Sequence, residues 1–300
     1  MADKVSTFRT PRDAERFLAR YDEIVADEWP VVHEDLDVPT RFGQTRVRRS
    51  GEGPGVPLVM VHPTAGSSVG WYPVIEPYCQ GRVVYTPDTM GTAGRSVQTE
   101  PFDSEADLAT WLDDVLDALD LPEVHTLGYS EGGWVATLHA AHTTRPQRLR
   151  SLTLIEPSGV LERIPPRLWL SMLGGALRVV LARDKTRAVR RLNAGMNGGG
   201  YELTDGQIEL LLASMTTFHQ RLPRPRPLAD DQFRRITAPS LLVLGEQTKL
   251  LHPKSAAARA TTLLPRVQVE IVPGAGHGVL FQQPQGVATL VRAFLSRQDD

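Results

Sequence analysis

Short runs of apolar residues alternate along much of the chain with longer stretches in which apolar residues recur every three or four positions. The short runs lack regular polar interruptions, which is typical of strands covered on both faces; they lie at 56–61, 83–86, 124–128, 152–155, 241–244 and 267–272. Helix-like stretches lie between several of them, at 105–119, 132–143, 254–264 and 284–296. This alternation predicts an α/β fold with a mostly parallel sheet flanked by helices.

The beginning of the chain has a different pattern. Apolar residues between positions 11 and 27 share one face of an amphipathic helix; they are Ala14, Phe17, Leu18, Tyr21, Ile24 and Val25. We expect this helix to pack on the main body, and the alternative is that it lines a substrate entrance. Two strand-like runs at 36–40 and 45–49 flank Gly43, which predicts a hairpin. The glycine-rich segment 51–55 is predicted to be a loop.

Residues 157–235 interrupt the strand and helix rhythm with helix-like, arginine-rich and glycine-rich sequence. We interpret this segment as an inserted helical cap over the carboxyl edge of the sheet. The three glycines at 198–200 would be its flexible joint, and the proline-rich residues 223–227 its return linker. The predicted organisation is therefore an N-terminal helical extension (1–35), a core formed by 36–156 and 236–300, and the cap (157–235).

Composition narrows the class of protein. The chain has 300 residues and a net charge of −2, with 41% hydrophobic and 23% charged residues. These values exclude a disordered chain and argue against a general nucleic-acid binder. Cys79 is the only cysteine, which excludes an intramolecular disulfide and a cysteine zinc cage.

Targeting and ligand motifs are also informative. The sequence shows neither a signal-peptide pattern nor a run of about 18 apolar residues, so we expect a cytoplasmic protein without a membrane partner. It contains neither a zinc-binding H-E-x-x-H motif nor a phosphate loop, and we expect no metal and no cofactor. The expected partner is a small-molecule substrate; the oligomeric state is open, with a homodimer as one option.

Ser130 lies in the strongest local motif, Gly128-Tyr129-Ser130-Glu131-Gly132. The motif follows a predicted strand and opens a predicted helix, which is the context that a G-x-S-x-G nucleophile elbow requires. Glycines suit such a turn because it leaves no room for larger side chains. The turn would lift the serine hydroxyl above the edge of the sheet.

With this motif, the sequence over roughly residues 36–298 resembles the α/β-hydrolases. Three further segments support the resemblance. Residues 59–66 (VMVHPTAG) resemble the strand and loop that supply the oxyanion hole, residues 87–96 resemble the D-x-x-G-x-G-x-S loop, and residues 273–277 (PGAGH) resemble the segment that carries the catalytic histidine.

The resemblance implies a serine hydrolase with Ser130 as the nucleophile and His277 as its base. The main competing histidine is His62, to which the family assigns support of the oxyanion loop. The backbone N–H groups of Thr64 and Glu131 would stabilise the oxyanion. Pro63 departs from the family's His-Gly pattern and removes one backbone donor, although the Thr64 N–H remains.

The catalytic acid is the second departure, because Thr248 occupies the position where the family usually has an aspartate. Glu156 directly follows the strand at 152–155, where some α/β-hydrolases keep the acid. Glu246 lies two residues before the usual position. We favour Glu156 over Glu246, and the remaining alternative is that no acid acts.

Other charged and apolar residues have two interpretations each. Glu131 would disfavour an anionic substrate, or it is a helix-start carboxylate favoured by the helix dipole. A basic cluster in the cap would attract an anionic substrate, or it is a solvated face; it comprises Arg178, Arg183, Lys185, Arg187, Arg190 and Arg191. A group of apolar residues would line an acyl pocket, or it is cap core; it comprises Leu168, Trp169, Leu170, Met172 and Leu173.

The leading hypothesis is a serine hydrolase that acts on a carboxylic ester of a small, largely apolar molecule through an acyl-enzyme. Thioester, lactone and C–C bond hydrolysis use the same apparatus, and the fold alone does not choose between them. One alternative is a biosynthetic enzyme of this fold that performs a non-hydrolytic step such as cyclisation or elimination. A catalytically inactive ligand-binding protein is another.

Overall fold

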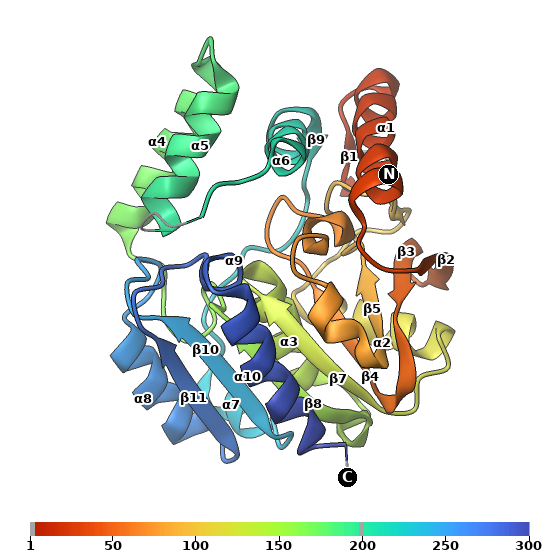
Figure 1. Cartoon of the computed structure of the whole chain (residues 1–300), viewed down its shortest axis with the longest axis vertical. Helices are drawn as coiled ribbons and strands as arrows, with labels where there is room; N and C mark the ends of the chain where they lie inside the picture. The colour runs from red at the N-terminus through yellow and green to blue at the C-terminus, as the bar shows by residue number, and fades with distance from the viewer. Residues whose placement is uncertain (1–3, 198–200, 300) are drawn as a thin grey trace.

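A mostly parallel sheet forms the centre of the molecule, in a computed structural model that describes residues 4–197 and 201–299. The strands run in the spatial order β11-β10-β8-β7-β4-β5-β3-β2, and the short β6 pairs with β3. Pairs from β11 to β5 are parallel, whereas β3 pairs antiparallel with β5 and β2. The predicted α/β class, with a mostly parallel sheet flanked by helices, is confirmed (Figure 1).

The strands match the apolar runs within a few residues at most ends. Their bounds are β2 His33–Thr40, β3 Gly43–Ser50, β4 Glu52–Val61, β5 Gln80–Pro87, β6 Val97–Gln98, β7 Val124–Tyr129, β8 Leu149–Ile155, β10 Ser240–Gly245 and β11 Val267–Val272. Strand β10 is buried at every position, which explains its uninterrupted apolar run, and β7 is also buried at every position although it contains His125 and Thr126. The β2–β3 hairpin forms around Gly43, whose φ of 131° suits glycine.

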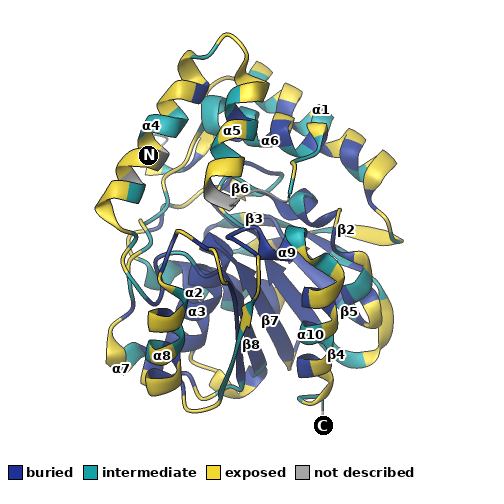
Figure 2. Ribbon diagram, turned by 60° about the vertical axis from the view of Figure 1, so that its left-hand side comes forward, coloured by how far each residue is buried: buried dark blue, intermediate teal, exposed yellow. Residues whose placement is uncertain are grey.

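Helices cover both faces of the sheet (Figure 2). On one face pack α2 (Ala106–Ala118), α3 (Glu131–His142), α7 (Asp230–Arg234) and α8 (Pro253–Leu263). The other face is covered by α10 (Pro284–Ser296), which follows the short α9 (Val279–Gln282). Each layer buries its own apolar cluster against the strands, so the sheet is held between two cores.

The remaining helices lie beyond the carboxyl ends of the parallel strands (Figure 1). They are α1 (Pro11–Glu28), α4 (Pro166–Leu181), α5 (Lys185–Asn197) and α6 (Asp205–Thr217). The expected glycine joint at 198–200 lies outside the described residues, and residues 223–227 have no regular secondary structure.

The N-terminal segment packs on the segment that contains α6. The short strand β1 (Thr7–Phe8) pairs antiparallel with β9 (Phe218–His219), which directly follows α6. Helix α1 lies against α6, where a side chain at Gly206 would come within 2.9 Å of Ile24. This pairing could not be predicted from the sequence, because both strands have only two residues.

The glycine-rich segment 51–55 was wrongly predicted to be a loop. Most of it belongs to β4, which begins at Glu52 and has register irregularities between Glu52 and Leu58. A side chain at Gly53 would come within 2.3 Å of the Gly81 backbone, so the glycine allows two backbones to meet in an irregular strand. Among the described residues, no helix is long and apolar enough to cross a membrane.

Candidate active site

Ser130 occupies the sharp turn between β7 and α3, as the motif predicts. Its φ of 55° and ψ of −118° are a strained conformation for a residue with a side chain. The neighbouring glycines make this turn sterically feasible. A side chain at Gly128 would come within 2.3 Å of the Gly132 oxygen, and one at Gly132 within 2.1 Å of the Val61 oxygen.

The structure brings Ser130, His277 and Glu156 into one chain of hydrogen bonds. The Nε2 atom of His277 lies 3.1 Å from the Ser130 Oγ, and its Nδ1 lies 3.0 Å from Glu156 Oε2. All three residues are buried. The Tyr129 ring stacks against the imidazole, and its hydroxyl donates to the His277 backbone oxygen at 3.0 Å. The imidazole is therefore held in place on several sides.

Glu156 is fully buried directly after β8, and its backbone φ is 47°. Its Oε1 accepts a hydrogen bond from the Gly245 N–H at 2.6 Å, and its Oε2 accepts one from the Thr248 hydroxyl at 2.6 Å. These donors come from the end of β10 and the turn after it, where the family usually has its acid. Glu246 is exposed instead and accepts from the Gly274 N–H, so the structure does not bring it to His277.

Thr64 and Glu131, the expected oxyanion donors, both border the cavity beside Ser130. Glu131 is the first residue of α3, so its N–H has no partner within the helix. Its side chain is buried, and burial raises the pKa of the carboxyl, an effect that a hydrogen bond with Thr64 opposes. Oε2 of Glu131 has no hydrogen-bond partner among the described residues.

His62 holds the loop that carries Thr64. Its Nδ1 lies 2.9 Å from the Pro63 oxygen, and its Nε2 accepts from the Thr89 N–H at 3.0 Å. Burial lowers the pKa of this imidazole, which suits a neutral ring that donates at Nδ1 and accepts at Nε2. This geometry agrees with a supporting position, because His62 makes these contacts away from the Ser130 hydroxyl.

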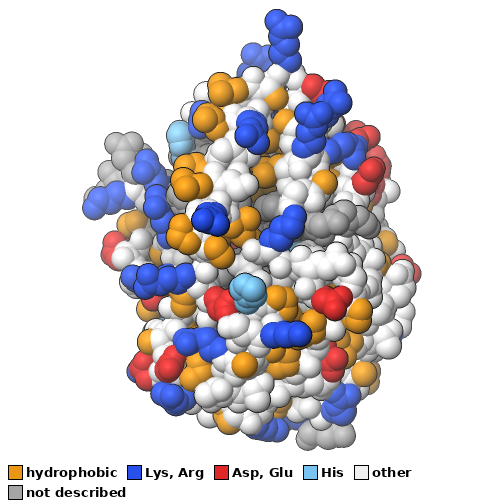
Figure 3. Space-filling model, turned by 90° about the vertical axis from the view of Figure 1, so that its left-hand side faces the viewer, with side chains coloured by type: hydrophobic (Ala, Val, Ile, Leu, Met, Phe, Trp, Pro, Cys, Tyr) orange, Lys and Arg blue, Asp and Glu red, His pale blue; other side chains and the backbone are white. Residues whose placement is uncertain are grey.

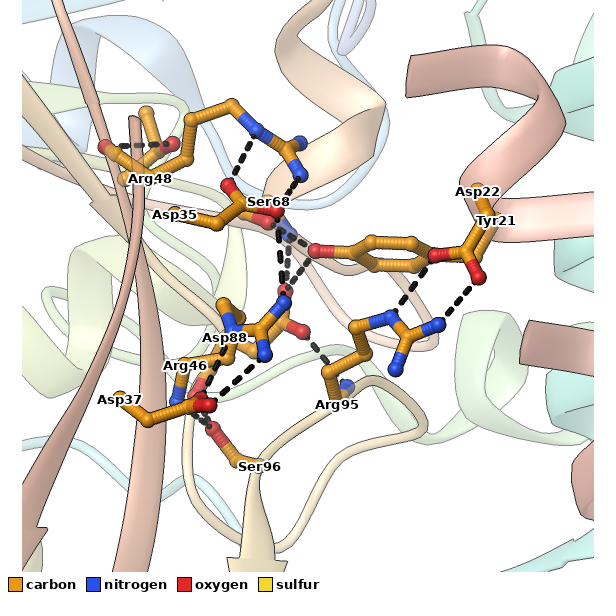
Figure 4. A network of polar contacts seen from close by, with 11 residues as sticks. Tyr21, Asp22, Asp35, Asp37, Arg46, Arg48, Ser68, Asp88, Arg95 and Ser96 are labelled. Carbon is orange, nitrogen blue, oxygen red and sulfur yellow. Dashed lines mark hydrogen bonds and ion pairs between the residues drawn. The ribbon is translucent and has the colours of Figure 1, made fainter. Parts of the chain in front are cut away.

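A polar network ties the same loop to the N-terminal helix (Figure 4). Asp88, from the predicted D-x-x-G-x-G-x-S segment, accepts from the backbone N–H groups of Ser68 and Arg95, each at 2.7 Å. The Tyr21 hydroxyl of α1 lies 2.8 Å from the Ser68 hydroxyl. The Arg95 side chain forms an ion pair with Asp22 of α1. Helix α1 is therefore anchored to the loops that surround the site.

A cavity of about 380 Å³ opens beside Ser130 and His277. Its walls are mainly apolar and come from the loop after β4, from α6 and from other elements; they include Phe17, Tyr129, Tyr201, Leu203, Leu210 and Phe281. Phe17 belongs to α1, so this helix both packs on the body and lines the cavity. The cavity is of a size that suits a small organic ligand.

The apolar residues at the start of the cap do not line this cavity. Leu170 and Leu173 are 66% and 56% exposed, which contradicts both the acyl-pocket and the cap-core interpretation for them. Leu168 borders a different groove, between α4 and α5, and the side chains of Trp169 and Met172 lie outside the described ones. The basic cluster is also absent from the cavity wall as described.

Sequence reasoning missed two hydroxyl groups in the site. Thr248 lacks a charge, yet its hydroxyl donates to Glu156. Ser158 places its Oγ 3.0 Å from the Ser130 Oγ, and its position two residues after Glu156 was the one available signal. Among the described residues, no group of three histidine, cysteine, aspartate or glutamate side chains is placed to hold a metal ion.

The nucleophile elbow, the hydrogen-bonded histidine and the parallel sheet define an α/β-hydrolase, and the chain belongs to this family. The profile of the alpha/beta hydrolase fold family matches residues 56–284. The chain is 29% identical to carboxylesterase YbfK of Bacillus subtilis, over 93% of each chain. It is 28% identical to the uncharacterised carboxylesterase nap of the same organism, over 94% of this chain and 93% of that protein.

Solved structures agree with this assignment. The crystal structure of the B. subtilis carboxylesterase CesB (YbfK) superposes with a TM-score of 0.84 at 28% identity, and the match covers 95% of this chain and 98% of that chain. The naproxen esterase of B. subtilis superposes with a TM-score of 0.82 at 26% identity, over 95% and 99% of the two chains. The similarity therefore includes the segments outside the sheet as well as the sheet.

Proposed function

We propose that this protein is a serine hydrolase that cleaves carboxylic esters of small, largely apolar molecules through an acyl-enzyme intermediate. The observation that carries the proposal is the hydrogen-bonded chain from Ser130 through His277 to Glu156, which opens on an apolar cavity. The carboxylesterases among the relatives, similar over almost their whole length, support the same reaction.

In the first half of the reaction, the Ser130 Oγ attacks the ester carbonyl while His277 Nε2 takes the hydroxyl proton. Glu156 keeps the Nδ1 proton in place and stabilises the imidazolium that forms. The N–H groups of Thr64 and Glu131 stabilise the negative oxygen of the tetrahedral intermediate. His277 then gives its proton to the departing alcohol, and the acyl group stays on Ser130.

In the second half, water attacks the acyl-enzyme and His277 takes one of its protons. The tetrahedral intermediate collapses, the carboxylic acid leaves, and Ser130 regains its proton from His277. The same sequence of proton transfers hydrolyses a lactone or a thioester. The three groups bonded to the Glu156 carboxylate are the Gly245 N–H, the Thr248 hydroxyl and His277 Nδ1, and they keep the base oriented through both halves.

The cavity supports a substrate with an apolar acyl or alcohol part. Tyr201 and Phe281 stack with their ring centroids 4.9 Å apart, and both border the space beside Ser130. An aromatic wall of this kind suits a flat apolar group. The Glu131 carboxyl in the same wall disfavours a carboxylate substrate at this position if it ionises.

Intact-protein mass spectrometry after exposure to a fluorophosphonate tests the proposal, together with turnover of p-nitrophenyl esters. Wild type is expected to gain one adduct on Ser130 and to hydrolyse the esters. Ser130→Ala is expected to do neither, at an unchanged melting temperature. An unlabelled wild type without turnover would exclude the esterase and leave the inactive ligand-binding protein. Labelling without ester turnover would favour the non-hydrolytic alternative.

A further inference from the structure

Helix α4 exposes a continuous apolar stripe at the outer end of the molecule. The side chains of Leu170, Leu173, Leu177, Val180 and Leu181 are 66%, 56%, 58%, 48% and 74% exposed. Their spacing of three and four residues places them on one face of the helix. Elsewhere among the described residues, large exposed apolar side chains are scattered singly, at Val32, Val97 and Ile271. Such a concentration marks an interaction surface.

The opposite face of α4 already has its partner. Val179 is fully buried and packs with Val189 of α5 in a small separate core. The stripe is therefore not the packing face of the helix. Figures 1 and 2 place α4 and α5 away from the sheet, with most of their residues exposed.

The surroundings of the stripe are strongly basic. Between residues 163 and 197 the sequence has eight arginine and lysine residues and one acidic residue, Asp184, although the whole chain has a net charge of −2. Figure 3 shows apolar side chains on this face with Lys and Arg side chains around them. The two α-helices therefore form a cationic and apolar tip on a chain that is otherwise acidic.

A groove between α4 and α5 gathers part of this charge. Arg178, Arg187 and Arg191 line it, and all three are exposed. Among the residues that the structure describes, no carboxylate forms an ion pair with any of the three, whereas Arg190 pairs with Asp205. Three arginines without carboxylate partners beside an apolar stripe suit an anionic group attached to an apolar body.

We propose that the α4–α5 tip, defined as residues 166–197, docks on a membrane surface that contains anionic phospholipids. The apolar stripe enters the boundary between headgroups and acyl chains, and the arginines bind lipid phosphates. The sequence suggested no membrane partner because it has no spanning segment, but a helix that lies in the surface needs none. This inference does not depend on ester hydrolysis.

Charge argues against the other occupants. Two copies of the tip face to face would bring two strongly positive surfaces together, which opposes self-association. A nucleic acid would pair with the arginines but offers no apolar surface to the leucine stripe. An anionic membrane offers phosphates to the arginines of the tip and an apolar interior to its leucine stripe.

Vesicle sedimentation with the full chain tests the proposal. We expect binding to phosphatidylcholine vesicles that contain phosphatidylglycerol, at least about tenfold weaker binding to pure phosphatidylcholine, and weakening by salt. The paired change Leu173→Ser with Leu177→Ser, and separately Arg187→Glu with Arg191→Glu, should each reduce binding about tenfold or more. Val32→Ser is the matched control, since it removes an exposed apolar side chain elsewhere and should leave binding unchanged.

Circular dichroism melting and turnover of a soluble ester confirm that each variant is folded. The proposal is overturned if wild type sediments with neither kind of vesicle, or if Val32→Ser loses as much binding as the leucine pair. It is also overturned if the wild type binds no vesicles and instead forms a dimer that the tip variants abolish, which sedimentation velocity measures. A complex with duplex DNA that the tip variants abolish would overturn it in the same way, and a gel-shift assay measures that complex.

Discussion

The Thr248 hydroxyl donates a 2.6 Å hydrogen bond to the carboxylate of Glu156. Thr248 lies where α/β-hydrolases usually have the acid, and Glu156 lies at the end of a neighbouring strand. The two positions therefore converge on one point next to His277 Nδ1, although only one of them holds a carboxylate. Exchanging the acid between strands leaves the imidazole with the same kind of partner.

Replacing Glu156 with glutamine is expected to reduce kcat by about 10³- to 10⁴-fold, because the amide cannot stabilise the imidazolium. The control is Glu246→Gln, which alters an exposed side chain bonded to the Gly274 N–H and should leave kcat within about twofold. Steady-state kinetics with a p-nitrophenyl ester measures both. Equal losses in the two variants would contradict the assignment of the acid.

Thr248→Val removes a donor to a buried carboxylate and keeps the side-chain shape. A hydrogen bond to a charged group contributes about 1.5–3 kcal/mol, so we expect kcat to fall by about ten- to a hundredfold. Thr248→Ser restores the hydroxyl and should recover most of the loss. A valine variant as active as wild type would show that this donor is dispensable.

The double variant Glu156→Gln with Thr248→Asp moves the carboxylate to the usual position of the family. It is expected to be at least about tenfold more active than Glu156→Gln alone, because a carboxylate again lies near His277 Nδ1. Thr248→Asp alone places two carboxylates together and should be less active than wild type. If the double variant is no better than Glu156→Gln, the two positions do not converge functionally.

Glu131→Gln is expected to change how stability depends on pH. Burial raises the pKa of Glu131 in the folded protein above its ordinary value of 4.5, so the folded state keeps this proton to higher pH than the unfolded state. The neutral Glu131 carboxyl therefore makes its full contribution to stability below about pH 4.5, and this contribution is lost as the pH rises through the raised pKa. The glutamine has no proton to lose, so its stability relative to wild type should increase across that window. Urea denaturation at a series of pH values measures this, and parallel curves would contradict it.

Gly132→Ala and Gly174→Ala are expected to have opposite effects. A methyl group at Gly132 would lie 2.1 Å from the Val61 oxygen, in the turn that holds Ser130, and should destabilise the fold by about 3 kcal/mol. At Gly174, inside α4, nothing lies within 4 Å, and alanine should stabilise by about 0.5–1 kcal/mol. The urea unfolding midpoints of the two variants measure the expected loss and gain in stability.

Regular, buried elements could be predicted from the sequence. Strand β10 contains a fully buried apolar run, β8 ends in a buried and mostly apolar one, and Ser130 lies in a motif whose glycines are sterically required. Glu156 could be named because it directly follows one such run. These features depend on short stretches of chain, so neighbouring residues are enough to predict them.

Features that depend on distant contacts could not be predicted. The 51–55 segment has loop composition, but pairing with the strand at 80–87 makes most of it part of β4. The hydroxyl of Thr248 reaches Glu156 only because β10 lies beside β8 in the folded sheet. Exposure of Leu170 and Leu173 follows from which face of α4 packs on α5, and hydrophobicity alone does not distinguish the two faces.

The pairing of Phe8 with Phe218 has a consequence for synthesis. Helix α1 leaves the ribosome before the strands of the central sheet, but β9 and α6, on which it rests, leave only after most of that sheet has been made. Its Phe17 side chain therefore reaches the cavity wall late, and His277 emerges later still. A nascent chain carries its serine long before the histidine and the cavity wall are in place, so catalytic competence begins only after the segment with His277 has been made.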